Sequence, residues 1–305
     1  MNEGVHPYVT EGLWPLIERA LQAAGKNPGN VTNLDTAPFD HFHTGGLEAS
    51  KDLLQIASAV QPAKILDLGA GIGGASRFLA EFTSASITSL DFEPEFCSVN
   101  RRLTEAVGYS SEIEVIVGDG TRLPFNTESF DWVWMQQAAM NIADKETLYS
   151  EIVRVLRPGG QFVFQEVVAG PMPGPLKLPT PWAAAQEDSH LEPAESMRTL
   201  LQRLGIHEVA FEDVTMSLMP GLQQRVDHVR ANGAPALGVH LLSTSDLLPI
   251  VEGMLLNAKS GRIAFVRGVY RRSGMHYALQ FWSQCLAFES SSRSICPDTA
   301  DFFLE

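Results

Sequence analysis

The feature that most constrains the fold is a regular alternation of apolar and amphipathic segments between residues 64 and 167. The apolar segments predict five strands, at Lys64–Leu68, Ser86–Asp91, Ile113–Val117, Phe130–Met135 and Gln161–Val167. The amphipathic segments predict three helices, at Gly73–Phe82, Pro94–Val107 and Asp144–Leu156. Because each helix must return the chain to the same end of the sheet, the alternation predicts a parallel sheet with helices on both faces.

The flanking segments lack this alternation. Helical spacing predicts helices over residues 11–24 and 47–60, separated by a loop from 25 to 38. A proline-rich loop, residues 169–181, leaves the sheet, and a strand is expected over 275–289. We therefore expect five parts, namely a helical N-terminal cover (1–62), an α/β core (63–215), a helical lid insertion (216–272), the final strand of the core (273–290) and a tail (291–305).

Composition limits the partners of the chain. It has 22 Lys and Arg against 36 Asp and Glu, a formal net charge of −14, which repels a nucleic-acid backbone or an anionic membrane. No run of about eighteen apolar residues suggests a membrane span, and the first residues do not read as a signal peptide. Cys97, Cys285 and Cys296 lack metal-ligand spacing. We expect a cytoplasmic monomer or homodimer with reduced thiols and no metal site.

A glycine-rich loop follows the first predicted strand and opens a helix. It reads DLGAGIGG over residues 67–74. Glycines at such a turn let the backbone bend sharply and approach a bound ligand closely. Gly69, Gly71 and Gly74 also satisfy the dinucleotide pattern GxGxxG, so the loop alone leaves a nicotinamide dinucleotide open.

Two further acids follow neighbouring strands. Asp91 ends the second strand, 24 residues after Asp67, where a carboxylate accepts hydrogen bonds from ribose hydroxyls. Asp119 follows the third strand, where a carboxylate can accept from the exocyclic amine of an adenine. Since ligands bind outside the carboxyl ends of such strands, the three acids face one crevice. A positively charged sulfonium suits this lining better than a pyrophosphate does.

In this order, the segments ILDLGAGIGGASRFLA, Asp91, GDGTRLPF, FDWVWMQQ and RVLRPGGQFVF resemble class I S-adenosylmethionine-dependent methyltransferases. The resemblance implies a Rossmann-like methyltransferase fold, with a mostly parallel seven-stranded sheet and an antiparallel last strand. It also implies an enzyme that takes S-adenosylmethionine as cofactor and moves its methyl group to a small molecule.

The resemblance assigns the glycine loop to the methionine end of the cofactor. It implies that Gly69, Ala70 and Gly71 line the methionine moiety, with Gly73 in the same loop. Asp67 is expected to act through the amino group of the cofactor.

The remaining cofactor residues implied by the resemblance follow the next three strands. Asp91 is expected to hold the ribose, with Phe92 beside the adenine. Asp119 and Gly120 are expected at the adenine edge. Gln136, after the fourth strand, is expected near the methionine ammonium or the transferred methyl group.

A narrower resemblance extends toward the N-terminus. Residues 39–49 (FDHFHTGGLEA) and 134–138 (WMQQA) are similar to segments of sarcosine and dimethylglycine N-methyltransferases. The chain departs from that group at Gln137, where an acid is common, and at Asn141, where a histidine is common. These departures put an amino-acid-like amine acceptor in question.

Other acceptors therefore stay open. The lid segments 169–191 and 221–261 are rich in apolar residues, which favours a lipophilic prenyl, polyketide or quinone-like acceptor methylated at carbon or oxygen. Tyr8, Trp14 and Trp182 are candidates for an aromatic wall. A module that binds the cofactor without turnover is the alternative from another class.

Methyl transfer is an in-line displacement, so it needs alignment first and a base only where the nucleophile must lose a proton. Four residues are candidates for catalysis or acceptor contact. His43 lies in the segment before the first strand, and Gln137 follows the fourth. Glu166 is expected at the end of the fifth strand, pointing into the crevice. His190 lies beside the expected lid.

Overall fold

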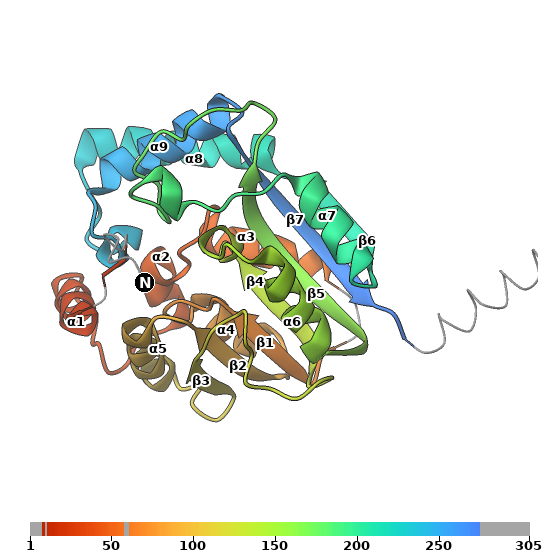
Figure 1. Cartoon of the computed structure of the whole chain (residues 1–305). Coiled ribbons are helices and arrows are strands. Elements are labelled where there is room, and N and C mark those ends of the chain that lie inside the picture. The colour runs from red at the N-terminus through yellow and green to blue at the C-terminus, as the bar shows by residue number, and fades with distance from the viewer. Residues whose placement is uncertain (1–7, 10, 58–60, 275–305) are drawn as a thin grey trace, which may run out of the picture. The chain divides into compact units, whose positions relative to one another are not determined.

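The computed structural model describes residues 8–9, 11–57 and 61–274 (Figure 1). One seven-stranded sheet runs in the order β3-β2-β1-β4-β5-β7-β6. Its strands are β1 (Lys64–Leu68), β2 (Ser86–Asp91), β3 (Ile113–Val117), β4 (Phe130–Gln136), β5 (Leu156–Ala169), β6 (Ile206–Asp213) and β7 (Ile263–Arg272). The first five strands pair in parallel, whereas β7 is antiparallel to both β5 and β6. The predicted Rossmann-like sheet with an antiparallel last strand is confirmed.

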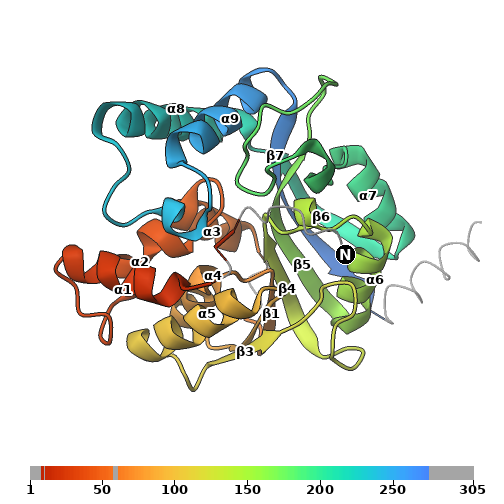
Figure 2. The same cartoon turned by 60° about the vertical axis from the view of Figure 1, so that its left-hand side comes forward.

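Helices cover the sheet and extend beyond one end of it (Figures 1 and 2). The α-helices are α1 (Leu13–Ala23), α2 (Asn33–Asp40), α3 (Gly46–Ile56), α4 (Gly74–Phe82), α5 (Pro94–Val107), α6 (Lys145–Val155), α7 (Ala194–Arg203), α8 (Thr215–Asn232) and α9 (Leu247–Lys259). The described residues also form three short 3-10 helices, η1 (Ala139–Asn141), η2 (Gln186–Asp188) and η3 (Val239–Leu242).

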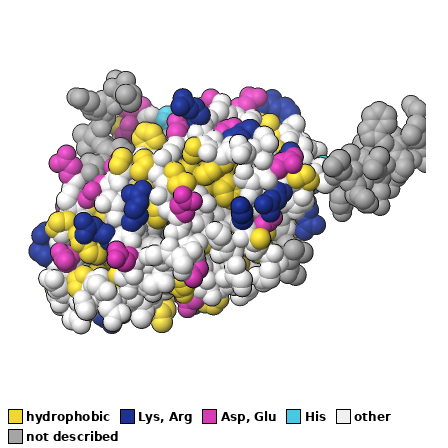
Figure 3. All heavy atoms as spheres, turned by 90° about the horizontal axis from the view of Figure 1, so that it is seen from below, with side chains coloured by type: hydrophobic (Ala, Val, Ile, Leu, Met, Phe, Trp, Pro, Cys, Tyr) yellow, Lys and Arg dark blue, Asp and Glu magenta, His cyan; other side chains and the backbone are white. Residues whose placement is uncertain are grey.

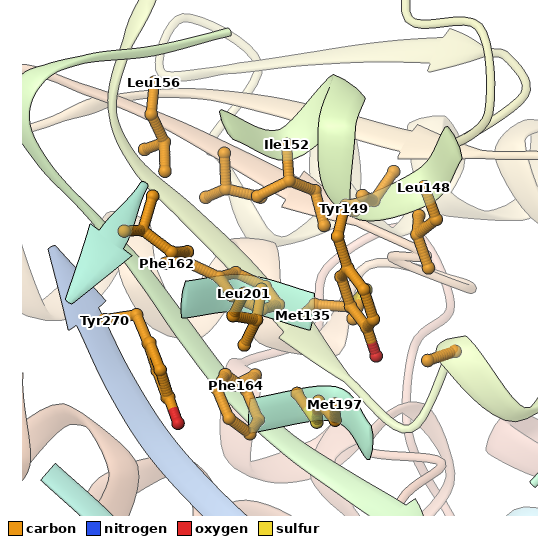
Figure 4. Close-up of a cluster of buried hydrophobic side chains, with 14 of the residues drawn as sticks. Met135, Leu148, Tyr149, Ile152, Leu156, Phe162, Phe164, Met197, Leu201 and Tyr270 are labelled. Atoms are coloured by element: carbon orange, nitrogen blue, oxygen red, sulfur yellow. The ribbon is translucent and has the colours of Figure 1, made fainter. Parts of the chain in front are cut away.

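The two faces of the sheet build separate apolar layers because successive strand side chains point to opposite sides. In β4, Val133 and Met135 pack with α6 and α7, and Trp132 and Trp134 pack on the opposite face with α3 and α4. Figure 4 shows the first layer, where side chains of α6 and α7 gather over Phe162 and its neighbours on β5. Burial on both faces is typical of parallel sheets and leaves the strand ends as the place for a ligand.

Helix α2 lies where a loop was expected. Thr32 and Asp35 cap it reciprocally. The Asp35 backbone nitrogen donates to Thr32 Oγ1 at 3.3 Å, and the Thr32 nitrogen donates to Asp35 Oδ2 at 2.9 Å. Pro38 lies inside the helix without ending it before Asp40. The loop prediction is therefore wrong for residues 33–38, because this capping box outweighs the proline.

Strand β7 also differs from expectation. Its residues 263–272 fall within the range assigned to the lid insertion, of which α8 and α9 form the helical part. Gly261, with φ of 68°, ends the loop after α9, and the apolar run that starts at Ile263 pairs with β5 at once. The final strand predicted over 273–290 and the tail over 291–305 lie outside the described residues, apart from 273 and 274.

Helices α8 and α9 lie side by side at one end of the sheet in both views (Figures 1 and 2). On the face shown in Figure 3, Lys and Arg side chains are interspersed with Asp and Glu. Among the described residues, no helix combines the length and the apolar character that crossing a bilayer requires.

Candidate active site

A cavity of about 600 Å³ lies at the carboxyl ends of β1, β2, β3 and β4, and is called the donor cavity below. Its walls come from the glycine loop after β1, the end of β2, the loop after β3 and the segment that follows β4. This is the size of a small-molecule site, at the position where open α/β sheets bind ligands.

The glycine loop needs its glycines for backbone conformation and for space. Gly69 and Gly73 have φ of 74° and 88°, in the left-handed region that favours glycine. A Cβ at Gly69 would lie 2.4 Å from the Cβ of Ala138, and one at Gly73 would lie 2.0 Å from Oδ1 of Asn100. At Gly71, which lines the donor cavity, a Cβ would meet nothing within 4 Å. The loop therefore packs tightly against the protein at Gly69 and Gly73 and leaves space at Gly71, on the side of the donor cavity.

Two carboxyl groups, the half-buried Asp91 and the buried Asp67, hold this loop in place. Oδ2 of Asp91 accepts from the Gly71 nitrogen at 2.7 Å, and Oδ1 accepts from the Glu93 nitrogen at 2.9 Å. Asp67 accepts from Oγ of Ser76 at 2.5 Å. Burial raises the pKa of Asp91 and raises that of Asp67 to about 7. The loop is thereby tied to the ends of β1 and β2.

The rest of the expected cofactor set also surrounds this cavity. Phe92 is 69% exposed at its edge, and Asp119 accepts from the nitrogen and Oγ1 of Thr121 at 2.8 and 2.7 Å. Gly73 caps α4 and stands outside the lining. The other nine predicted residues line the cavity, namely Asp67, Gly69, Ala70, Gly71, Asp91, Phe92, Asp119, Gly120 and Gln136.

Gln136 presents a free hydrogen-bond donor at the donor cavity. Its Oε1 accepts from Nε1 of Trp134 at 2.8 Å and from Oγ of Ser50 at 3.0 Å. Since an indole N–H only donates, the oxygen of the amide must face Trp134. Nε2 is buried and has no partner within the described part of the chain. A buried donor left in this way is expected to meet an acceptor on a ligand.

A second cavity of about 230 Å³, called the acceptor cavity below, adjoins the first. The two share Phe42, His43 and Gln137 in their walls. Helices α8 and α9, with η3 between them, supply most of the remaining wall. Its apolar side chains are Leu218, Leu222, Val239, Leu247, Ile250, Val251 and Met254.

Gln137 stands between the two cavities in an unusual backbone conformation. Its φ is 53°, which is costly for a residue with a side chain, and its nitrogen donates to the Gln165 oxygen at 2.8 Å. Oε1 accepts from the Thr44 nitrogen at 3.0 Å, whereas the buried Nε2 has no partner among the described residues. Such strain is characteristic of functional sites, and here it fixes an amide N–H₂ group at the junction.

His43, the other polar residue at the junction, is neutral. Its Nε2 lies 3.4 Å from Nδ1 of His41 and 3.3 Å from Oγ of Ser50. Burial lowers the pKa of His43 to about 3. Nδ1 has no partner within the described residues, so it is available to a ligand. The ring can join a hydrogen bond but is a weak base at neutral pH.

The structure separates the two other catalytic candidates. Glu166 lines neither cavity, and its oxygens accept from the nitrogens of Ala138 and Ala139 at 3.2 and 3.3 Å. The prediction that it points into the crevice is wrong, because β5 continues to Ala169 and this side chain faces η1 instead. His190 does line the donor cavity, where its nitrogen donates to the Met140 oxygen at 2.9 Å.

Of the three aromatic candidates, two line the donor cavity and one does not. Tyr8 and Trp182 line the donor cavity, whereas Trp14 lies under the Arg102 guanidinium, 5.4 Å from the ring centroid. Sequence reasoning missed Arg225 and His240 of the acceptor cavity. Neither residue carried a local signal, because this cavity joins α8 and η3 to segments that are far away in the sequence.

Comparison with known proteins identifies the core. Residues 66–164 match the methyltransferase domain family. The chain is 34% identical over 155 residues to a glycine/sarcosine/dimethylglycine N-methyltransferase of Actinopolyspora halophila, covering 50% of this chain and 27% of that protein. It is 27% identical over 221 residues to a 24-methylenesterol C-methyltransferase of Arabidopsis thaliana, covering 72% and 53%.

The match to a solved structure concerns the fold. The geranyl diphosphate C-methyltransferase of Streptomyces coelicolor A3(2), in complex with Mg²⁺, geranyl diphosphate and S-adenosyl-L-homocysteine, superposes with a TM-score of 0.60 at 16% identity. The alignment covers 74% of this chain and 78% of that one. The chain spans between about a quarter and a half of the length of the two curated relatives above.

Proposed function

We propose that this chain, which carries a class I S-adenosylmethionine-dependent methyltransferase domain, moves a methyl group from S-adenosylmethionine to a small-molecule acceptor. The observation that carries the proposal is the junction of two cavities of different character. The donor cavity is lined by nine of the residues that the resemblance assigns to the cofactor, and it meets a mainly apolar cavity at Phe42, His43 and Gln137.

The residues of the donor cavity fit this cofactor chemically. The Asp91 carboxyl group offers lone pairs to the ribose hydroxyls, and the exposed ring of Phe92 offers a face to the adenine. The unpartnered Nε2 of Gln136 is a donor, so it suits the carboxylate of the methionine part rather than its ammonium. When bound, S-adenosylmethionine supplies a methyl group on a positively charged sulfur.

The chain's own contribution is alignment and the exclusion of water. Apolar walls in the acceptor cavity keep the acceptor dry, and the fixed amide of Gln137 orients it at the junction. His43 stays neutral and adds a hydrogen bond through Nδ1. No residue is assigned as a strong general base, since in-line displacement requires one only for an acceptor that must lose a proton.

The acceptor cavity favours a lipophilic acceptor, methylated at carbon or oxygen, over a cationic amine. Its walls are largely apolar, and no Asp or Glu of the described chain lines it, so a protonated amine would lack a counter-charge there. By name, one of the two relatives is a glycine/sarcosine/dimethylglycine N-methyltransferase and the other is a 24-methylenesterol C-methyltransferase, so both classes of acceptor occur among the names of similar proteins.

The proposal also includes the cellular setting. We place the reaction in small-molecule metabolism of the cytoplasm, in a monomer or homodimer without nucleic-acid partners. The net charge of −14 and the free, buried thiol of Cys97 support this setting.

Transfer of a labelled methyl group tests the proposal. Purified protein is incubated with methyl-labelled S-adenosylmethionine and a metabolite extract of the source organism, and the small molecules are separated. We expect one labelled product class, reduced at least about tenfold in Gln137→Ala because the orienting hydrogen bond is lost. It is expected to be unchanged in Gln224→Ala, since this residue of α8 is exposed and lines neither cavity. Tight binding of the donor without any labelled product would favour a non-catalytic binding module instead.

A further inference from the structure

The acceptor cavity contains a cationic side chain with no counter-ion. Arg225 of α8 lines it, and no carboxylate of the described residues lies within ion-pair distance of its guanidinium. No Asp or Glu of the described chain lines the cavity either. Other Lys and Arg side chains of the described chain also lack an ion pair, but Arg225 is the one that lines the acceptor cavity, where a ligand can supply the missing charge.

Arg225 is solvent-exposed, and it is one of the residues that line the acceptor cavity. The protein packed around it still removes enough hydration to lower the pKa of its guanidinium. The same guanidinium is close enough to His43 to contribute to the lowered pKa of that ring. Arg225 and His43 both line the acceptor cavity, and His43 also lines the donor cavity, where the acceptor is expected to react.

Unpartnered polar atoms gather around the same cavity. Nε2 of Gln137, Nδ1 of His43 and Nδ1 of His240 are all buried without a hydrogen-bond partner in the described chain, and all three residues line the cavity. Burial also lowers the pKa of His240. The Gln137 nitrogen can only donate, and each imidazole Nδ1 donates in one of its tautomers. The Gln137 amide and Arg225 thus supply donors with no acceptor, and the two imidazoles can each add a donor in the tautomer that carries the proton on Nδ1.

We propose that the methyl acceptor is an amphiphile with an apolar body and one anionic group, a carboxylate or a phosphate, which pairs with Arg225. The apolar walls of α8 and α9 take the body, and the guanidinium offers up to two parallel hydrogen bonds to the anion. This inference rests on the proposed function, because it names the chemical class of the acceptor in the same site.

The first test combines labelled transfer with anion exchange. The labelled product formed from the extract is applied to an anion-exchange resin at pH 8. We expect retention of the product and its release by salt. Arg225→Met is expected to lose about tenfold to a hundredfold in transfer, with Arg225→Lys between it and the wild type, and with binding of S-adenosylhomocysteine unchanged in all. A labelled product that passes through unretained, or full activity in Arg225→Met, would overturn the inference.

Arg230→Met is the matched control. This residue lies on the same helix but is exposed and pairs with Glu252 at 2.7 Å, so its removal is expected to leave transfer unchanged. Thermal unfolding of each variant is measured to check that the variant is folded.

A second measurement does not depend on turnover. Protein loaded with S-adenosylhomocysteine is titrated with benzoate, phenyl phosphate and the neutral benzamide, with binding followed by ligand-observed NMR. We expect the anions to bind the wild type more tightly than benzamide does, and to lose that advantage in Arg225→Met. The comparison of benzoate with phenyl phosphate identifies the preferred anion. Equal binding of benzamide and both anions would contradict the inference, whereas failure of S-adenosylhomocysteine to bind would contradict the proposed function instead.

Discussion

Glu166 is a buried carboxyl group whose hydrogen bonds indicate a positioning role. Both carboxyl oxygens accept from backbone nitrogens of the turn after β4, and burial raises the pKa of this group to about 8. That turn carries Gln137, the strained residue between the cavities. Glu166 is therefore placed to position the junction rather than to contact the acceptor.

Because the raised pKa keeps a proton on Glu166 in the folded state, the free energy of unfolding depends on pH. The folded state holds the Glu166 proton up to about pH 8, whereas an unfolded glutamic acid releases it near pH 4.3. Between these values the folded state binds more protons, so the free energy of unfolding falls as pH rises, by at most about 1.4 kcal/mol per pH unit from this group. We expect Glu166→Gln to flatten this decline in urea unfolding measured from pH 5 to 8.

Glu105→Gln, on the exposed side of α5, serves as the control and is expected to follow the wild-type curve. A Glu166→Gln curve parallel to that of the wild type would show that Glu166 is ionised in the folded protein over this range.

At the scale of elements, a buried ion pair joins α2 to α4. Nη2 of Arg77 lies 2.8 Å from Oδ2 of Asp40, and it also donates to the Ile72 oxygen at 2.9 Å. Both side chains are buried. The pair fixes the N-terminal cover against α4, the helix that begins at the glycine loop. We therefore expect that a loss of this pair destabilises both the cover and the glycine loop of the donor cavity.

Removing one partner leaves the other charge buried without compensation. We expect Asp40→Asn to lower the free energy of unfolding by about 3 kcal/mol, as measured by denaturant unfolding. The exposed pair Arg230–Glu252 provides the comparison, and Glu252→Gln is expected to cost less than about 1 kcal/mol. Equal small losses in both variants would mean that the buried pair does not hold the cover in place.

Helices and strands whose apolar residues recur at regular spacing could be predicted from the sequence. Elements that depend on a local helix cap or on long-range strand pairing could not. Strands β1, β2 and β3 begin and end at the predicted residues, because their apolar runs are bounded by polar or glycine residues. Helix α2 was missed because Pro38 and the neighbouring polar residues favour a loop unless the Thr32 cap is weighed. β7 was missed although Gly261 separates its apolar run from α9, because its place in the sheet is set by long-range pairing with β5 and β6.

At the scale of the whole molecule, the two cavities differ in how far sequence reasoning could reach. The donor cavity follows from the ends of successive parallel strands, so Asp67, Asp91 and Asp119 could be brought together in advance. The acceptor cavity joins residues 42–45 with parts of α8, η3 and α9 that lie some 170 to 210 positions later. No sequence period records that packing, which is why Arg225 escaped notice.

The central claim is that the donor cavity binds S-adenosylmethionine, and isothermal titration calorimetry tests it most directly. We expect the wild type to bind S-adenosylmethionine and S-adenosylhomocysteine with comparable affinity. Asp91→Ala is expected to bind both about tenfold to a hundredfold more weakly, since it removes charge-assisted hydrogen bonds. Glu114→Ala, on the exposed side of β3, is expected to bind as the wild type does. No heat of binding in the wild type, or unchanged affinity in Asp91→Ala, would contradict the account.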